Sequence, residues 1–250
     1  MSDKNNSNPS DRSADTKARI LDAALSEFSA KGLAGARTER IAAEAGVNKA
    51  LLYYHFESKE RLYLAALEMI AGKVRDASMA VFLSDATPGE RIVRTALNHF
   101  DRIMAQQEYQ SLMQQEMMRV HEGEMGSALP MLVKQAFAPL HAMFRQQVQE
   151  GIASGELIDV DWMQIILAAQ GCNVFYFLSA PVWRMLNPVD PYTIDALKFR
   201  RKALVDFLGQ ALFQDRRHGA EVAARVFGDT PMPEIKGGRV TFGRKDERAK

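Results

Sequence analysis

Cysteine and long apolar runs are scarce in this sequence of 250 residues. The single cysteine excludes an intramolecular disulfide and a zinc site built from several cysteines. No uninterrupted apolar run reaches the roughly 18 residues typical of a membrane-spanning helix. The first ten residues, MSDKNNSNPS, are polar throughout and do not have the pattern of a secretory signal. We therefore expect a cytoplasmic protein that makes no membrane contact.

An excess of charge of one sign is also lacking. The chain has 32 Lys and Arg residues and 31 Asp and Glu residues, a formal net charge of +1. By segment, the net charge is 0 for residues 1–70, −2 for 71–213 and +3 for 214–250. A protein that binds nucleic acid through bulk positive charge is expected to be more basic, so a DNA-binding surface here must depend on a few well-placed residues.

Motifs for catalysis and cofactor binding are missing as well. His121-Glu122 lacks the second histidine of a metalloprotease motif, and residues 32–35 lack the preceding strand and the third glycine of a dinucleotide-binding loop. There is no P-loop, and Cys172 lies in an apolar segment, where a thiol is usually inert. We predict that the chain is not an enzyme and has neither a cofactor nor a metal site.

What the sequence does contain is helical periodicity over most of its length, which predicts an all-α fold. Residues 1–14 are rich in Asn, Ser and Asp and are predicted to be a disordered arm. We expect a helix-turn-helix domain over 15–70, a helical domain over 71–213 and a basic, mostly loose tail over 214–250, in which 238–242 is a weak candidate strand. The expected helices are 16–32, 38–45, 49–54, 59–82, 89–106, 109–121, 127–151, 161–179 and 191–213, with Pro181 among the breaks.

Residues 38–56, TERIAAEAGVNKALLYYHF, are the most informative segment. Two short helices are separated by a turn in which Gly46 permits a positive φ and Asn48 caps the following helix. The second helix is too short to be stable alone, so its neighbours must hold it. A plain helical hairpin has a similar turn. The hydrogen-bonding side chains that follow favour a helix-turn-helix instead, because two adjacent tyrosines, Tyr53 and Tyr54, cannot both face the core.

From Thr16 to about Met69 the sequence resembles the DNA-binding domain of the TetR family of bacterial transcriptional regulators. The resemblance covers roughly a fifth of the chain. Asn48 and Ala50 depart from the commoner Ser and Gly. The matching positions are Ile20-Leu21-Asp22-Ala23-Ala24, Phe28, Lys31-Gly32, Thr38, Ile41-Ala42, Ala45-Gly46-Val47, Lys49, Leu52-Tyr53, His55-Phe56, Lys59-Glu60 and Leu62.

The resemblance implies that the helix after Asn48 enters the major groove of double-stranded DNA, with phosphates held on both sides. Tyr53 has a second interpretation, in which it packs mainly between helices. Leu52 and Phe56 are expected in the core, whereas Glu39 and Glu44 are expected to point elsewhere. The implied DNA-binding residues are Thr38, Asn48, Lys49, Ala50, Leu51, Tyr53, Tyr54, His55 and Lys59.

The resemblance also implies that the second domain forms a homodimer and binds a small-molecule effector. The segments 161–179 and 194–212 are candidates for a four-helix dimer interface; the alternative is a monomer with these helices in its own core. Methionine and aromatic side chains are candidates for an adaptable effector pocket, although such residues are more often simply core. The candidates are Met104, Met113, Met117, Phe137, Phe144, Trp162 and Phe175.

The functional hypothesis is a ligand-responsive repressor that binds a palindromic operator as a homodimer. The alternative is an all-helical ligand-binding or scaffold protein whose helix-turn-helix no longer binds DNA. The two differ at Lys49, Tyr54 and Lys59, which the first hypothesis requires to be exposed on one face.

Overall fold

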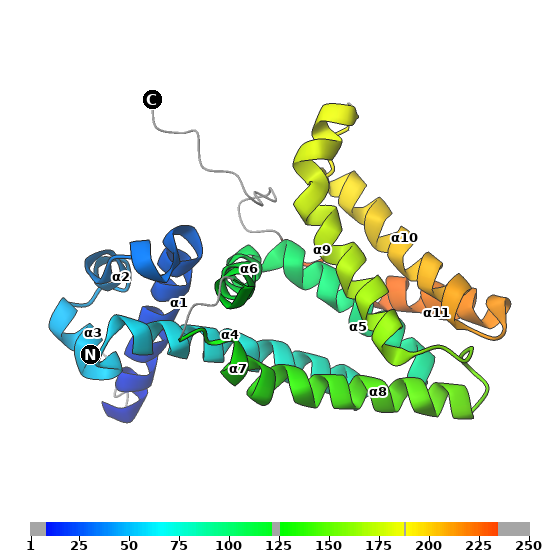
Figure 1. Cartoon of the computed structure of the whole chain (residues 1–250), viewed down its shortest axis with the longest axis horizontal. Helices are drawn as coiled ribbons and strands as arrows, with labels where there is room; N and C mark the ends of the chain where they lie inside the picture. Colours follow the sequence, from blue (N-terminus) through cyan, green and yellow to red (C-terminus); the bar gives the residue numbers. More distant parts are fainter. Residues whose placement is uncertain (1–8, 122–125, 188, 235–250) are drawn as a thin grey trace, which may run out of the picture. The chain divides into compact units, whose positions relative to one another are not determined.

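The computed structural model describes residues 9–121, 126–187 and 189–234 (Figure 1). Within these ranges the chain forms helices and no strand, apart from an isolated bridge between Leu157 and Phe213, so the predicted all-α class is confirmed. The helices are α1 (Pro9–Gly35), α2 (Thr38–Glu44), α3 (Lys49–Phe56), α4 (Lys59–Phe82), α5 (Pro88–Ala105), α6 (Gln107–His121), α7 (Leu129–Leu132), the π-helical segment η1 (Val133–Phe137), α8 (Ala138–Ala153), α9 (Trp162–Leu186), α10 (Ile194–Leu212) and α11 (Arg216–Asp229).

Three predicted boundaries are wrong. α1 begins at Pro9, so residues 9–14 are not part of a disordered arm, while residues 1–8 lie outside the described residues. The segment 127–151 is not one helix, because it is divided into α7, η1 and α8. Pro181 does not end α9, which continues to Leu186.

The described residues divide into two compact units, and the division differs from the predicted boundary at residue 70. Unit 1 contains the chain up to Val74 together with Glu108–Phe137, and unit 2 contains Arg75–Gln107 and the described residues from Ala138 onward. α6 and α7 therefore belong with the helix-turn-helix and not with the second domain, because Leu112 (0% exposed) and Met113 lie in the same hydrophobic core as α1–α4.

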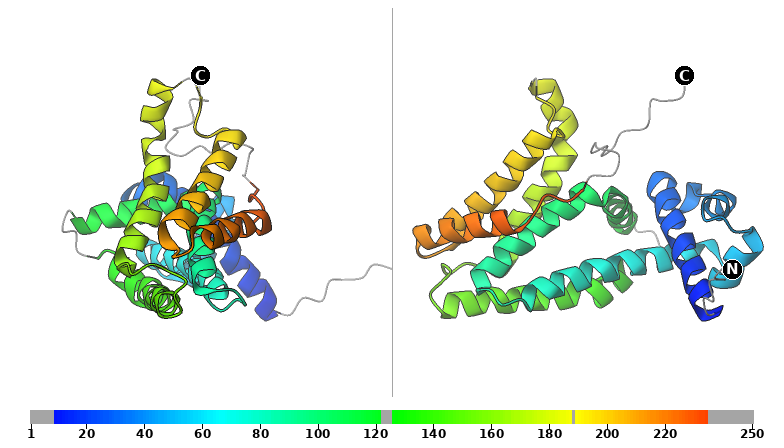
Figure 2. Two further views of the ribbon diagram at one scale, coloured as in Figure 1. Left: turned by 90° about the vertical axis from the view of Figure 1, so that its right-hand side faces the viewer. Right: turned by 180° about the vertical axis from the view of Figure 1, so that it is seen from behind.

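Unit 2 is built around α5, which packs against α8, α9, α10 and α11 (Figure 2). An ion pair lies in its interior, where the guanidinium of Arg201 in α10 donates to both carboxylate oxygens of Asp101 in α5 at 2.6 and 2.7 Å. A second ion-pair cluster joins α5 to α11, because Glu90 accepts hydrogen bonds from Arg94 and Arg225.

The segment 214–250 was predicted to be mostly loose, and this is wrong for α11. Asp215 caps the helix by accepting from two backbone N–H groups, and Val222 and Val226 are fully buried. α10 and α11 approach each other at Gly209 and Gly219, where a Cβ on either residue would lie 2.5 Å or less from the carbonyl oxygen of the other. The candidate strand 238–242 lies outside the described residues.

Candidate nucleic-acid interface

The turn between α2 and α3 is fixed by backbone hydrogen bonds and by a side chain from α1. Gly46 has φ +67°, and its N–H donates to the carbonyl of Ala43 at 3.1 Å. The N–H of Val47 donates to the carbonyl of Ala42 at 2.9 Å. Arg19 of α1 donates from Nη1 to the carbonyl of Ala45 at 2.8 Å. The turn therefore has little freedom to change the angle between the two helices.

α3 is held from one side and presents the other side to solvent. Leu52 (0% exposed) and Phe56 are buried, as predicted. Asn48 caps the helix, because its Oδ1 accepts from the N–H of Leu51 at 2.7 Å. Tyr54 is 81% exposed, the largest exposed fraction on the helix-turn-helix among the large hydrophobic side chains. The exposed residues at the start of α3 are Asn48, Lys49, Ala50 and Leu51.

Lys49 is paired with a carboxylate from α2. Its Nζ donates to Oε1 of Glu39, which lies in the first turn of α2. The hydrogen bond to Lys49 lowers the pKa of Glu39, and the same bond raises the pKa of Lys49. The expectation that Glu39 points away from the recognition helix is therefore wrong.

The side chains of Thr38 and Tyr53 form a hydrogen bond with each other. Thr38 is buried, and its hydroxyl lies 3.2 Å from the hydroxyl of the half-buried Tyr53. The ammonium of Lys49 lies 5.8 Å from the centre of the Tyr53 ring. These contacts favour the interpretation in which Tyr53 packs between helices and orients its neighbours.

Lys59, in the first turn of α4, is half-buried and makes local hydrogen bonds. Its Nζ donates to the carbonyls of Ala34 and Ala36, at 3.3 and 3.4 Å, where α1 ends. His55 is half-buried between aromatic neighbours, and its ring centre lies 5.4 Å from that of Tyr54. Both side chains thus have partners in the protein as well as access to solvent.

All nine predicted DNA-binding residues lie in unit 1, on α2, on α3 with its N-cap Asn48, or at the start of α4. Sequence reasoning missed three charged residues that shape this region. Arg19 holds the turn, Glu39 pairs with Lys49, and the buried Glu27 accepts from the N–H of Arg37 at 3.2 Å. No local signal marks them, because each acts through a contact with another helix.

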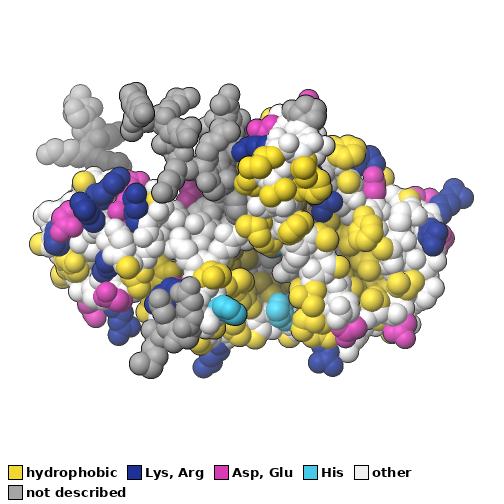
Figure 3. Space-filling model, turned by 45° about the horizontal axis from the view of Figure 1, so that its top comes forward, with side chains coloured by type: hydrophobic (Ala, Val, Ile, Leu, Met, Phe, Trp, Pro, Cys, Tyr) yellow, Lys and Arg dark blue, Asp and Glu magenta, His cyan; other side chains and the backbone are white. Residues whose placement is uncertain are grey.

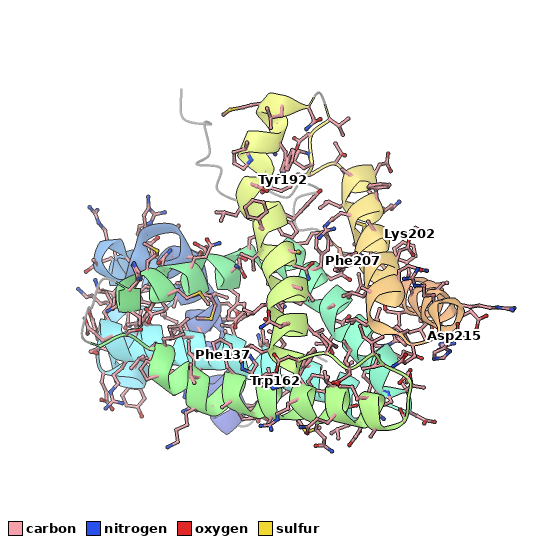
Figure 4. The ribbon with its side chains drawn as sticks, turned by 45° about the vertical axis from the view of Figure 1, so that its right-hand side comes forward. Phe137, Trp162, Tyr192, Lys202, Phe207 and Asp215 are labelled. Carbon is pink, nitrogen blue, oxygen red and sulfur yellow. The ribbon has the colours of Figure 1, made fainter. Side chains whose placement is uncertain are left out.

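The residues predicted to line an effector pocket are divided between the two units. Met113, Met117 and Phe137 belong to unit 1, whereas the other four residues belong to unit 2. Phe137 and Trp162 are labelled in Figure 4. Met104 (0% exposed) and Phe144 are core, while Phe175 is 60% exposed. Methionines and aromatic residues are common in the core, on exposed helix faces and in pockets alike, so the effector pocket stays a prediction. Among the described residues, no group of three or more His, Cys, Asp or Glu side chains could hold a metal ion.

Comparison with known proteins places the helix-turn-helix among bacterial regulators. The family model described as "Bacterial regulatory proteins, tetR family" matches residues 20–66. The HTH-type transcriptional repressor SCO4008 of Streptomyces coelicolor is 47% identical over 66 residues, which are 26% of this chain and only 33% of that repressor. The HTH-type transcriptional regulator RutR of Escherichia coli is 31% identical over 170 residues, 66% of this chain and 75% of RutR.

Solved structures share the fold over both units. A transcriptional regulator from Saccharomonospora viridis in complex with choline has a TM-score of 0.64 at 19% identity and covers 81% of this chain and 100% of its own. The ketosteroid transcriptional regulator KstR2 of Mycobacterium tuberculosis has a TM-score of 0.58 at 22% identity, covering 80% and 95%. At these identities the likeness shows the fold.

Proposed function

The chain belongs to the TetR family of bacterial regulatory proteins, and we propose that it is a ligand-responsive repressor that binds a palindromic operator as a homodimer. It is a DNA-binding transcriptional regulator, and regulators of this family are not enzymes, which confirms the prediction that the chain is not an enzyme. Because its target is chromosomal DNA, we also propose that it acts in the cytoplasm.

The observation that carries this proposal is the exposed face of α3. A helix held by Leu52 and Phe56 and capped by Asn48 presents Lys49 and Tyr54 outward. Lys49 lies at the N-terminal end of α3, which is the end of a recognition helix that meets base edges in the major groove. The scaffold alternative does not account for these exposed side chains on a rigidly held, short helix.

An exposed apolar surface on α9 and α10 supports dimerisation. On α9, the exposed fractions of Leu167, Phe175 and Leu178 are 59%, 60% and 58%, and these residues lie at helical spacing on one face. On α10, Phe199 and Phe207 are 76% and 61% exposed. Figure 3 shows hydrophobic side chains gathered over this part of unit 2. Large contiguous apolar patches mark interaction sites, and a second copy of the chain offers a matching patch by two-fold symmetry.

α9 also has the length and composition of a membrane span. An 18-residue window has a mean hydropathy of 1.5, and a third of it is buried. α9 is not an uninterrupted apolar run, because it contains Gln164, Gln170 and Asn173. The opposite face of α9 nevertheless belongs to the core of unit 2, where Ile165, Ala169 and Phe177 are buried. We therefore assign its apolar exposed face to the dimer.

The interior of unit 2 offers polar groups suited to an effector. The fully buried Asn173 of α9 donates from Nδ2 to the carbonyl of Ala96 at 3.0 Å, and its Oδ1 has no hydrogen-bond partner among the described residues. Burial, with a smaller contribution from the charge of Arg102, lowers the pKa of His99 to about 3, so the ring is neutral near pH 7. Its Nδ1 lies 3.3 Å from Asn173 Nδ2 and accepts from it, which leaves the proton on Nε2.

Asn173 Oδ1 and His99 Nε2 therefore supply one acceptor and one donor without charge. This chemistry favours a neutral effector that carries both a donor and an acceptor, rather than a cation such as the choline bound by the Saccharomonospora viridis regulator. Effector binding would then lower the affinity for DNA only if it favours a conformation different from the DNA-bound one.

Selection of binding sites from random double-stranded DNA, at stated salt concentrations, tests the proposed function. We expect a motif of two inverted half-sites whose centres lie roughly 34–36 Å apart or a multiple of that. Selection of no motif by a folded, dimeric protein would instead support the scaffold alternative.

A further inference from the structure

Glu39 and Lys49 form an exposed ion pair across the helix-turn-helix. Glu39 lies in the first turn of α2, and Lys49 is the first residue of α3. Their side chains are 62% and 51% exposed, so the pair is open to a ligand that approaches the recognition helix. Within the described residues, Glu39 is the only acidic side chain that forms an ion pair with α3.

The pair offsets a charge where DNA binding favours a positive one. Arg37 lies close enough to lower the pKa of Glu39, although its contribution is smaller than that of Lys49. The Tyr53 ring lies behind the ammonium of Lys49. Without its partner, Lys49 would attract any phosphate; with Glu39 beside it, the two side chains present an acceptor and a donor of nearly zero net charge.

A carboxylate at this position has few favourable partners on DNA. Phosphates repel it. Most of the polar base atoms exposed in the major groove are hydrogen-bond acceptors, which a carboxylate cannot pair with. The exocyclic N4 amino group of cytosine is the donor that Glu and Asp side chains contact, and the N7 and O6 atoms of guanine are acceptors for lysine. A C·G pair presents both kinds of group on neighbouring edges, which matches the paired carboxylate and ammonium.

We propose that Glu39 is a specificity-determining residue whose carboxylate accepts from cytosine N4 while Lys49 donates to guanine in the major groove. On DNA that lacks a C·G pair opposite these two side chains, Glu39 faces hydrogen-bond acceptors and stays paired with Lys49. Lys49 is then not free to bind a phosphate, so binding to nonspecific DNA is weakened. This inference rests on the proposed function, since it requires sequence-specific DNA binding through α3.

The experiment compares the full-length protein with Glu39→Ala, Glu39→Gln and Glu44→Ala in selection from random DNA, followed by competition with DNA that lacks the motif. Glu44→Ala is the matched control, because it removes an exposed carboxylate from the last residue of the same helix. All variants are first checked for unchanged melting temperature and oligomeric state.

For the wild type we expect a C·G pair at one symmetry-related position of each half-site. Glu39→Ala should reduce the preference for this pair about tenfold and strengthen binding to competitor DNA, whereas Glu44→Ala should alter neither by more than about twofold. Glu39→Gln should shift the preference toward adenine, which a glutamine amide contacts through N6 and N7.

The outcomes separate this inference from the proposed function. If the wild type selects no motif, sequence-specific binding itself fails. If the wild type selects a motif and Glu39→Ala retains every base preference with the same competitor affinity as Glu44→Ala, the motif stands and the role of Glu39 is refuted. A lost preference at a pair other than C·G would also overturn the assignment.

Discussion

The hydroxyl of Tyr63 in α4 donates to a carboxylate oxygen of Glu116 in α6 at 2.7 Å, and Glu116 is 0% exposed. The same carboxylate accepts from Arg119, from the hydroxyl of Ser127 and from the N–H of Ala128, at 2.8, 2.7 and 2.6 Å. One buried anion thus joins α4, α6 and the start of α7, which explains why α6 and α7 belong to unit 1.

Removing this anion is expected to destabilise unit 1. We expect Glu116→Ala to lower the free energy of unfolding by about 3–5 kcal/mol, because its buried donors lose their acceptor. Tyr63→Phe should cost about 1–3 kcal/mol, since it removes a single donor. Denaturant unfolding followed by circular dichroism measures both changes, and equal losses for the two variants would contradict the central role of Glu116.

The same site gives a pH dependence. Burial alone would raise the pKa of Glu116, but hydrogen bonds from Tyr63, Ser127, Ala128 and Arg119 outweigh it and hold the pKa below 4.5. A depressed pKa stabilises the folded state above the unfolded pKa, and this contribution is lost as the pH falls through the folded pKa. The stability difference between wild type and Glu116→Gln should therefore shrink as the pH falls below about 4.5. A difference that stays constant across this range would show that the charge of Glu116 is not involved.

Much of the helix-turn-helix could be predicted because its signals are local. Asn48 caps α3 and Gly46 leaves α2 with a positive φ, and each needs only its near neighbours in the chain. The pairing of Glu39 with Lys49 could not be predicted, because it depends on the angle between two helices. The packing of α6 in unit 1 involves the buried Glu116. Glutamate is usually exposed, so the sequence does not predict this burial.

The errors at the carboxyl end have a similar cause. α11 has few large apolar residues, so its periodicity is weak, but it packs through Val222, Val226 and the close approach of Gly209 to Gly219. Glycines in a helical pattern normally indicate a break. Here they allow α10 and α11 to pack closely, which only the structure shows. Phe207 and Lys202 on α10, and Asp215 at the start of α11, can be followed in Figure 4.

Gly46→Ala tests the turn. An alanine at φ +67° costs roughly 1–2 kcal/mol, and its Cβ would lie 3.4 Å from Nη1 of Arg19, which holds the turn. We expect a lower melting temperature and weaker operator binding. Gly72→Ala, inside α4 with no atom within 4 Å of the added Cβ, is the matched control and should raise stability by about 0.5–1 kcal/mol. If Gly46→Ala and Gly72→Ala changed the melting temperature and operator binding equally, a Cβ at position 46 would not strain the turn.

Lys59→Ala tests the predicted phosphate contact at the start of α4. We expect weaker binding to operator and to random DNA alike, with the salt slope reduced by about one. Lys59 also donates to the carbonyls of Ala34 and Ala36, so Lys59→Gln, which keeps a donor but loses the charge, separates the two roles. Lys73→Ala, at an exposed site further along α4, is the control. An unchanged salt slope for Lys59→Gln would rule out the phosphate role.

Asn173→Leu separates stability from effector response in unit 2. The side chains are similar in volume. The substitution removes the hydrogen bond from Nδ2 to the carbonyl of Ala96, which costs stability, and also the buried Oδ1 that has no partner among the described residues, which offsets that cost. We therefore expect the free energy of unfolding either to rise or to fall by less than about 1 kcal/mol. Neutral effectors should bind more weakly, because the group proposed to bind them is removed. Thermal unfolding measures the first effect. A loss above about 3 kcal/mol would mean that Asn173 is a structural residue, since only a heavily used hydrogen-bonding group costs that much.

Charge placed on the exposed face of α10 tests the dimer. Phe199→Glu and Phe207→Glu introduce carboxylates at side chains that are 76% and 61% exposed, so neither should disturb the fold of a single chain. We expect both variants to sediment as monomers at concentrations at which the wild type is a dimer, because an unpaired charge buried at an interface costs several kcal/mol. Operator affinity should fall in parallel, since a monomer contacts one half-site. Leu83→Glu, at an equally apolar residue that is 72% exposed outside α9 and α10, is the control and should remain dimeric. If the two α10 variants remain dimers, the interface lies elsewhere; if the wild type is itself monomeric and partitions into lipid vesicles, the exposed face of α9 serves a membrane instead.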